Sequence, residues 1–86
     1  MTRPITREGD DTSHGGKVIR VTGTLSIDGR HNARVGDWVS CPKHGDNQIT
    51  DPGGTMLDNG IPVVLHGCRS ECGSTVISSS QATVAV

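Results

Sequence analysis

The chain has almost no aromatic side chains and no long apolar run. Its 86 residues contain one tryptophan, Trp38, and neither phenylalanine nor tyrosine, and hydrophobic residues make up only 31% of the sequence. Small domains with so little apolar surface usually need a disulfide, a metal ion or a partner for stability. No apolar run approaches the roughly 20 residues of a membrane-spanning helix, so such a helix is excluded.

An excess of charge is also missing. The sequence contains eight lysines and arginines and nine aspartates and glutamates, which gives a net charge of -1. Nucleic-acid-binding proteins usually carry a basic face and often stacking aromatic residues, so we expect no nucleic acid partner. Residues 1–11 are polar and do not resemble a secretory signal peptide, so export would require another route.

Helical periodicity is absent as well, and the residues present favour strands. Twelve glycines are spread along the chain, and valine and isoleucine dominate its apolar residues. Short β-type runs at 18–21, 25–27, 35–39, 61–65 and 75–77 are separated by turn residues, and 50–60 is expected to be one long loop. The sequence predicts an all-β fold of short strands, forming one domain over residues 1–86.

The chain also contains an internal repeat of three units. When the units are aligned on Gly9, Gly36 and Gly67, the fifth residue after each glycine is His14, Cys41 and Cys72 in turn. Three copies of one β unit predict pseudo-threefold symmetry within a single chain. Equivalent positions can then meet on the axis, so we expect two thiols and an imidazole to converge there.

These side chains favour a metal site over a disulfide framework. Three cysteines are an odd number, and four histidines accompany them. Structural zinc takes four ligands, usually cysteine sulfur and histidine nitrogen. The possible ligands are His14, Cys41, His44, His66, Cys68 and Cys72.

Within this set, the short spacing of Cys41-Pro42-Lys43-His44 lets both end residues reach one ion. Cys68 matches Asp10 and Asp37 in the repeat, so we expect it to lie away from the metal. His31 follows the Asp28-Gly29 turn and is expected to be exposed.

Catalysis by the same residues is the less favoured interpretation. Cys41 and His44 resemble a nucleophile and its base, and Glu71 could serve as general base for an open-site zinc hydrolase. No third residue is available to orient such a pair, and the chain has few residues with which to wall a pocket. We therefore expect the protein not to be an enzyme.

Four motifs in order resemble the PAAR-repeat family. They are Gly9-Asp10-Asp11-Thr12-Ser13-His14-Gly15-Gly16, Ala33-Arg34-Val35-Gly36-Asp37, Ser40-Cys41-Pro42-Lys43-His44-Gly45 and Glu71-Cys72-Gly73. The resemblance covers about residues 3–79. The Pro-Ala-Ala-Arg tetrapeptide that gives the family its name is degenerate here, as His31-Asn32-Ala33-Arg34 and Pro62-Val63-Val64-Leu65.

The resemblance implies a small conical β domain with one structural Zn²⁺ ion near its apex. Family sites typically use three histidines and one cysteine. Carried onto this chain, His14, His44 and Cys72 match directly. His66 is placed fourth, ahead of Cys41, which the repeat alignment favours instead.

The resemblance also implies a function. Such domains cap the trimeric VgrG spike of a type VI secretion system, one monomer per trimer, and sharpen it for piercing a target membrane without stable membrane binding. We expect residues 78–86 to be a short tail rather than an effector extension, although effector cargo is a possible partner. The protein would assemble in the cytoplasm and leave with the spike. The alternative is a free-standing, zinc-stabilised β adaptor that binds another protein.

Overall fold

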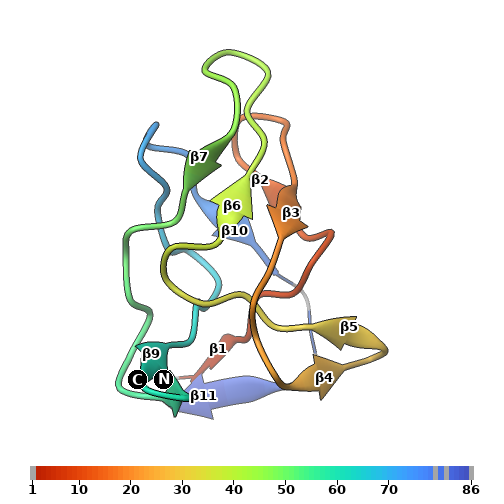
Figure 1. Ribbon diagram of the computed structural model, residues 1–86, viewed down its shortest axis with the longest axis vertical. Coiled ribbons are helices and arrows are strands. Elements are labelled where there is room, and N and C mark those ends of the chain that lie inside the picture. The colour runs from red at the N-terminus through yellow and green to blue at the C-terminus, as the bar shows by residue number, and fades with distance from the viewer. Residues whose placement is uncertain (1, 79, 81, 86) are drawn as a thin grey trace.

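The computed structural model describes residues 2–78, 80 and 82–85, and tapers from a wide end to a narrow apex (Figure 1). Its elements are short strands joined by turns, which confirms the all-β prediction. Within the described residues, no helix is long and apolar enough to span a membrane. The strands are β1 (Thr2–Pro4), β2 (Asp11–Thr12), β3 (Val18–Arg20), β4 (Ser26–Ile27), β5 (Arg30–His31), β6 (Trp38–Val39), β7 (Asn47–Gln48), β8 (Leu57–Asp58), β9 (Ile61–Pro62), β10 (Val76–Ile77) and β11 (Thr83–Ala85).

A closed ring of backbone hydrogen bonds joins the three repeat units. The N–H of Thr6 donates to the carbonyl of Val64 (2.9 Å), that of Ala33 to Thr6 (2.9 Å), and that of Val64 to Ala33 (3.0 Å). Each unit therefore donates to one neighbour and accepts from the other, and all three residues are fully buried. This cyclic pattern surrounds a pseudo-threefold axis, as the spacing of the glycines predicts.

The aligned glycines occupy equivalent turns around this axis. Gly9, Gly36 and Gly67 have φ angles of +87°, +96° and +90°, a region that side chains other than glycine rarely adopt. The N–H of each donates to a carbonyl further along its own unit, at Val18 (2.8 Å), Ile49 (2.8 Å) and Val76 (2.9 Å). The repeated glycines thus turn each unit from the axis toward the apex in the same way.

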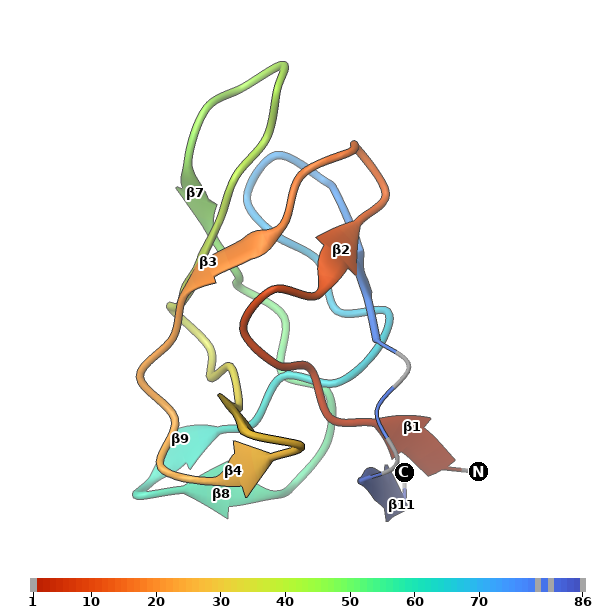
Figure 2. The same ribbon diagram turned by 90° about the vertical axis from the view of Figure 1, so that its right-hand side faces the viewer.

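Three two-stranded ribbons form the wide end (Figures 1 and 2). Two are hairpins, β4–β5 and β8–β9, closed by the two-residue turns Asp28-Gly29 and Asn59-Gly60. All four turn residues have positive φ, as the tight turns favoured in hairpins require. The stretch 50–60 was expected to be one long turn or loop, and this holds for residues 50–56. It was wrong for Leu57–Asp58, because the Asn59-Gly60 turn reverses the chain and pairs β8 with β9.

The third ribbon is made from the two ends of the chain. β1 pairs antiparallel with β11, with Thr2 opposite Ala85 and Pro4 opposite Thr83. The segment expected to be a short tail thus contains the strand that completes the wide end. Ser79, Gln81 and Val86, which belong to that segment, lie outside the described residues.

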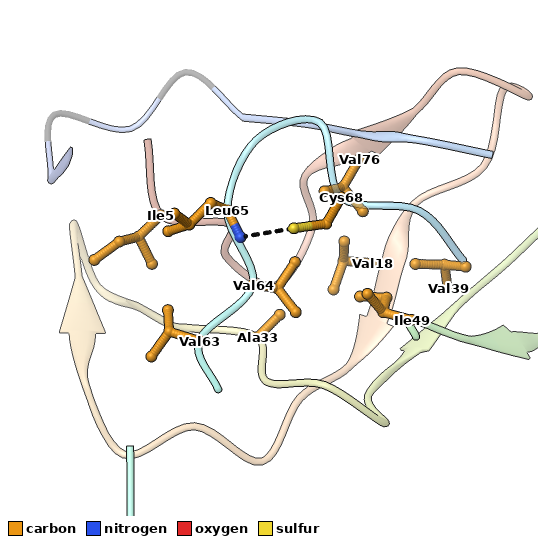
Figure 3. Packing of buried hydrophobic residues seen from close by; sticks show 10 residues of the cluster. All are labelled: Ile5, Val18, Ala33, Val39, Ile49, Val63, Val64, Leu65, Cys68 and Val76. Carbon is orange, nitrogen blue, oxygen red and sulfur yellow. Dashed lines mark hydrogen bonds between the residues drawn. The ribbon is translucent and has the colours of Figure 1, made fainter. Parts of the chain in front are cut away.

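The core lies between the wide end and the apex and contains small aliphatic side chains from all three units (Figure 3). None is larger than leucine or isoleucine, in keeping with a chain that has one aromatic residue. The buried cluster consists of Ile5, Val18, Ala33, Val39, Ile49, Val63, Val64, Leu65, Cys68 and Val76.

Candidate metal centre

A second ring of backbone hydrogen bonds lies closer to the apex. Its donors are the fourth residues after the three aligned glycines. The pairs are Ser13 N–H to Thr75 O (2.9 Å), Ser40 N–H to Lys17 O (2.8 Å) and Glu71 N–H to Gln48 O (2.9 Å). The next residues along the chain are His14, Cys41 and Cys72, so the ring brings all three to one place.

The three side chains form a compact donor cluster. One ligand atom each from His14, Cys41 and Cys72 lies within 4.8 Å of the other two. Nδ1 of His14 is 3.7 Å from Sγ of Cys41 and 3.7 Å from Sγ of Cys72. Cys41 is buried and the other two are partly buried. The convergence predicted from the repeat is therefore present in the fold.

These distances fit a tetrahedral metal ion. With metal bonds of about 2.3 Å to sulfur and 2.0–2.1 Å to nitrogen, tetrahedral angles separate sulfur and nitrogen by about 3.6 Å. The observed separations of 3.7 Å match this value. Two thiol sulfurs and one imidazole nitrogen are also ligands that zinc and other borderline or soft metals prefer. The cluster could hold a metal ion through three protein ligands.

Two serine hydroxyls favour the thiolate form of Cys72. Oγ of Ser70 and Oγ of Ser74 each lie 3.4 Å from Sγ of Cys72. Their hydrogen bonds lower the pKa of this thiol to about 5, with a smaller contribution from His14, although partial burial acts in the opposite direction. Since the thiolate is the metal-binding form, Cys72 is mostly in the form that can coordinate a metal at neutral pH.

Neither serine was predicted from the sequence to act at the site. Ser70 occupies the place of Thr12 in the repeat, and the hydroxyl of Thr12 accepts a hydrogen bond from the N–H of Gly16 (3.0 Å). The alignment thus places a hydroxyl at this position in the first and third units, whereas the second unit has Val39 there. Only in the unit that contains Cys72 is a thiol close enough to use the hydroxyl.

His44 lies beside the cluster on the loop between β6 and β7, which reaches furthest toward the apex (Figures 1 and 2). Its ring centroid is 6.1 Å from that of His14, and the side chain is exposed. The carbonyl of Cys41 accepts hydrogen bonds from the N–H groups of His44 and Gly45, which closes the turn that begins at Cys41. Of the histidines outside the cluster, His44 is thus the one next to it.

His66 does not join the cluster. Its Nδ1 accepts a hydrogen bond from the N–H of Ser78 (3.0 Å), and its side chain is exposed. His66 comes directly before Gly67, as Glu8 precedes Gly9, on the side of the turn that leads away from the apex. The geometry therefore favours Cys41 over His66, the reverse of the order that the sequence analysis gave them.

Cys68 has a structural place outside the cluster. Its Sγ accepts a hydrogen bond from the N–H of Leu65 (3.4 Å), as Asp10 does from Arg7 (2.7 Å). The side chain is fully buried, and burial raises the pKa of its thiol. Cys68 therefore replaces an aspartate of the repeat and remains a neutral core residue.

Replacement of His66 is expected to leave metal binding intact. His66→Ala should bind metal like the parent chain, whereas Cys41→Ser should not, because Cys41 belongs to the donor cluster and His66 does not. Elemental analysis of the two purified variants after gel filtration in buffer with trace zinc checks this. Loss of zinc by His66→Ala and its retention by Cys41→Ser would instead support the three-histidine set.

Comparison with known families identifies one family whose model matches the chain. The family model described as PAAR motif matches residues 8–78, which include all three aligned glycines and the whole donor cluster. A search of curated proteins finds no match. Because the family model covers most of the sequence, the chain belongs to the PAAR motif family.

Proposed function

We propose that this chain is a structural spike-tip protein that caps the trimeric VgrG spike of a type VI secretion system. The observation that carries the proposal is the closed backbone ring of Thr6, Ala33 and Val64. A monomer with threefold backbone symmetry can sit coaxially on a threefold trimer, with each unit meeting one subunit. Membership of the PAAR motif family supports a structural function rather than a catalytic one.

The wide end is the surface suited to the trimer. It carries the three ribbons β1–β11, β4–β5 and β8–β9 (Figures 1 and 2). Two-stranded ribbons leave unpaired backbone edges, which can extend the sheets of a β-structured partner. β8–β9 also exposes Leu57 and Ile61, which would lose apolar surface to water on docking.

We further propose that the apex binds one structural zinc ion through His14, Cys41 and Cys72, with His44 as the fourth ligand. When bound, zinc supplies a tetrahedral cross-link between side chains of all three units. The two serines beside Cys72 favour its thiolate form, and a side-chain rotation would bring the ring of His44, which is 6.1 Å from that of His14, to the ion. This cross-link would keep the three apex turns together when the tip is driven against a target membrane.

Assembly and export follow from the same proposal. The chain would fold and dock on the spike in the cytoplasm, and would leave the cell with the spike. The target membrane would be pierced by the tip rather than stably bound. Effector cargo would travel on the same particle.

A docking assay tests the proposal with a matched pair of variants. The parent chain should bind a blunt β-helical VgrG trimer with one monomer per trimer. Leu57→Asp, at a side chain that is 58% exposed in the wide end, should weaken binding at least tenfold, because it places a charge in an apolar contact. Ile77→Asp, at a side chain 46% exposed in β10 above the wide end, should bind like the parent.

Calorimetric titration of the trimer with each variant gives both affinity and stoichiometry. Three chains per trimer, or equal weakening by both substitutions, would rule out coaxial docking through the wide end. Absence of binding by a well-folded parent chain would favour the free-standing adaptor. Hydrolytic activity that disappears with the metal would favour the metalloenzyme.

A further inference from the structure

The donor cluster contains two thiols with no covalent bond between them. Cys41 and Cys72 come from different repeat units, yet their Sγ atoms lie within 4.8 Å of each other and contact the same imidazole nitrogen. Cys41 lies two residues after the short strand β6, and Cys72 lies in the turn before β10. All three cysteines of the chain are free.

We propose that Cys41 and Cys72 form an intramolecular disulfide when the metal is absent and a peroxide is present, so that the apex alternates between a metal-binding dithiol and a metal-free disulfide. The disulfide itself needs only the thiol pair, whereas the alternation rests on the metal site proposed above; neither depends on whether the chain caps a spike. It extends the site from a passive cross-link to one that responds to redox conditions.

The positions of the two sulfurs favour this pairing. A disulfide bond is about 2.05 Å long, so the sulfurs must approach each other from their present separation. Both belong to turns outside the strands, where rotation about the Cα–Cβ bond moves Sγ without breaking a strand pair. Nδ1 of His14 lies 3.7 Å from each sulfur, so both thiols already contact the same imidazole.

The third cysteine is excluded by its surroundings. Sγ of Cys68 faces the N–H of Leu65 (3.4 Å) inside the core, and the residue has no exposed surface. A small peroxide in solution reaches the partly exposed Cys72 before it reaches a thiol in this position. One pairing is therefore expected from three possible ones.

The reaction balances with hydrogen peroxide as the two-electron oxidant. One thiolate attacks a peroxide oxygen, the O–O bond breaks, and a sulfenic acid forms as hydroxide leaves. The second thiolate then attacks this sulfur, the S–S bond forms and a second hydroxide leaves. The two thiol protons convert the hydroxides to water, so two thiols and one peroxide give one disulfide and two waters.

Metal binding and the disulfide exclude each other, because both use the same two sulfur atoms. A bound metal would engage a lone pair of each sulfur and so slow the oxidation of both thiols. The disulfide would remove both thiolate ligands and leave the metal with the imidazoles of His14 and His44. The disulfide would still join the second and third repeat units. An apex that loses its metal under oxidising conditions would thus keep a cross-link.

In the experiment, the 86-residue chain is treated with a chelator and then with one equivalent of hydrogen peroxide. The expected product is a monomer lighter by about 2 Da, the mass of two hydrogen atoms. Trypsin separates the three cysteines, since cleavage after Arg34, Lys43 and Arg69 places them in peptides 35–43, 44–69 and 70–86. Peptides 35–43 and 70–86 should be linked, and peptide 44–69 should retain a free thiol.

Two comparisons make the result decisive. Zinc added before the peroxide should slow disulfide formation at least tenfold, and dithiothreitol should restore zinc uptake to the oxidised chain. In urea, the pair Cys68–Cys72 should dominate instead, because three intervening residues make the shortest loop to close. Native chain that yields Cys68 disulfides, intermolecular dimers or three unreacted thiols would overturn the proposal.

Discussion

Cys72→Ser is expected to abolish the zinc-dependent rise in melting temperature. The substitution removes the thiol that Ser70 and Ser74 hydrogen-bond and that lies 3.7 Å from His14. At free zinc a hundredfold above the dissociation constant, binding stabilises the folded parent chain by about 2.7 kcal/mol. For a domain of this size, that corresponds to a rise of about 10–20 °C, which the variant should not show.

Melting curves in zinc and in chelator measure this difference for each protein. Cys68→Ser is the matched control: it alters a fully buried core thiol and should lower both curves while preserving the gap between them. An unchanged gap in Cys72→Ser would remove Cys72 from the ligand set. A gap lost in both variants would mean that zinc binding depends on general stability rather than on the cluster.

Gly16→Ala is expected to be strongly destabilising, although it replaces only a hydrogen by a methyl group. A Cβ on Gly16 would lie 1.8 Å from the carbonyl oxygen of Ser40, a backbone atom of the neighbouring unit. The clash would push apart the apex turns that carry His14 and Cys41. We expect a loss of about 3 kcal/mol or more in unfolding free energy, and weakened zinc binding as well.

The neighbouring glycine provides the control. Gly15 has a φ of +84°, and its nearest atom to an added Cβ would be Cγ of Pro42 at 4.0 Å. Gly15→Ala should therefore cost only about 1–2 kcal/mol of backbone strain. Denaturant titration of both variants measures the two costs, and equal losses would show that no close contact exists at Gly16.

Much of the fold followed from the spacing of three glycines. Gly9, Gly36 and Gly67 predicted three equivalent turns, and both hydrogen-bonded rings repeat with the same offsets from them. The same alignment placed His14, Cys41 and Cys72 together, because residues equidistant from equivalent turns occupy equivalent places around an axis. Family likeness alone had put His66 ahead of Cys41.

The ends of the chain and the wide end were harder to predict. β11 has no turn signal of its own, since its partner β1 lies at the other end of the chain. The hairpin of β8 and β9 was hidden within a run of turn residues, although Asn59-Gly60 is a strong hairpin signal. Local patterns identify a turn more readily than they identify which distant segment will pair across it.

The sequence by itself therefore determined the β class, the threefold repeat and the three donors at equal offsets. Only the tertiary structure decided that the chain ends supply the third ribbon, that His44 lies beside the donors, and that His66 turns away to Ser78. The physical reason is that a repeat fixes what happens at equivalent positions. The places of residues without equivalents in the other units depend on the path of the whole chain, and tertiary packing determines that path.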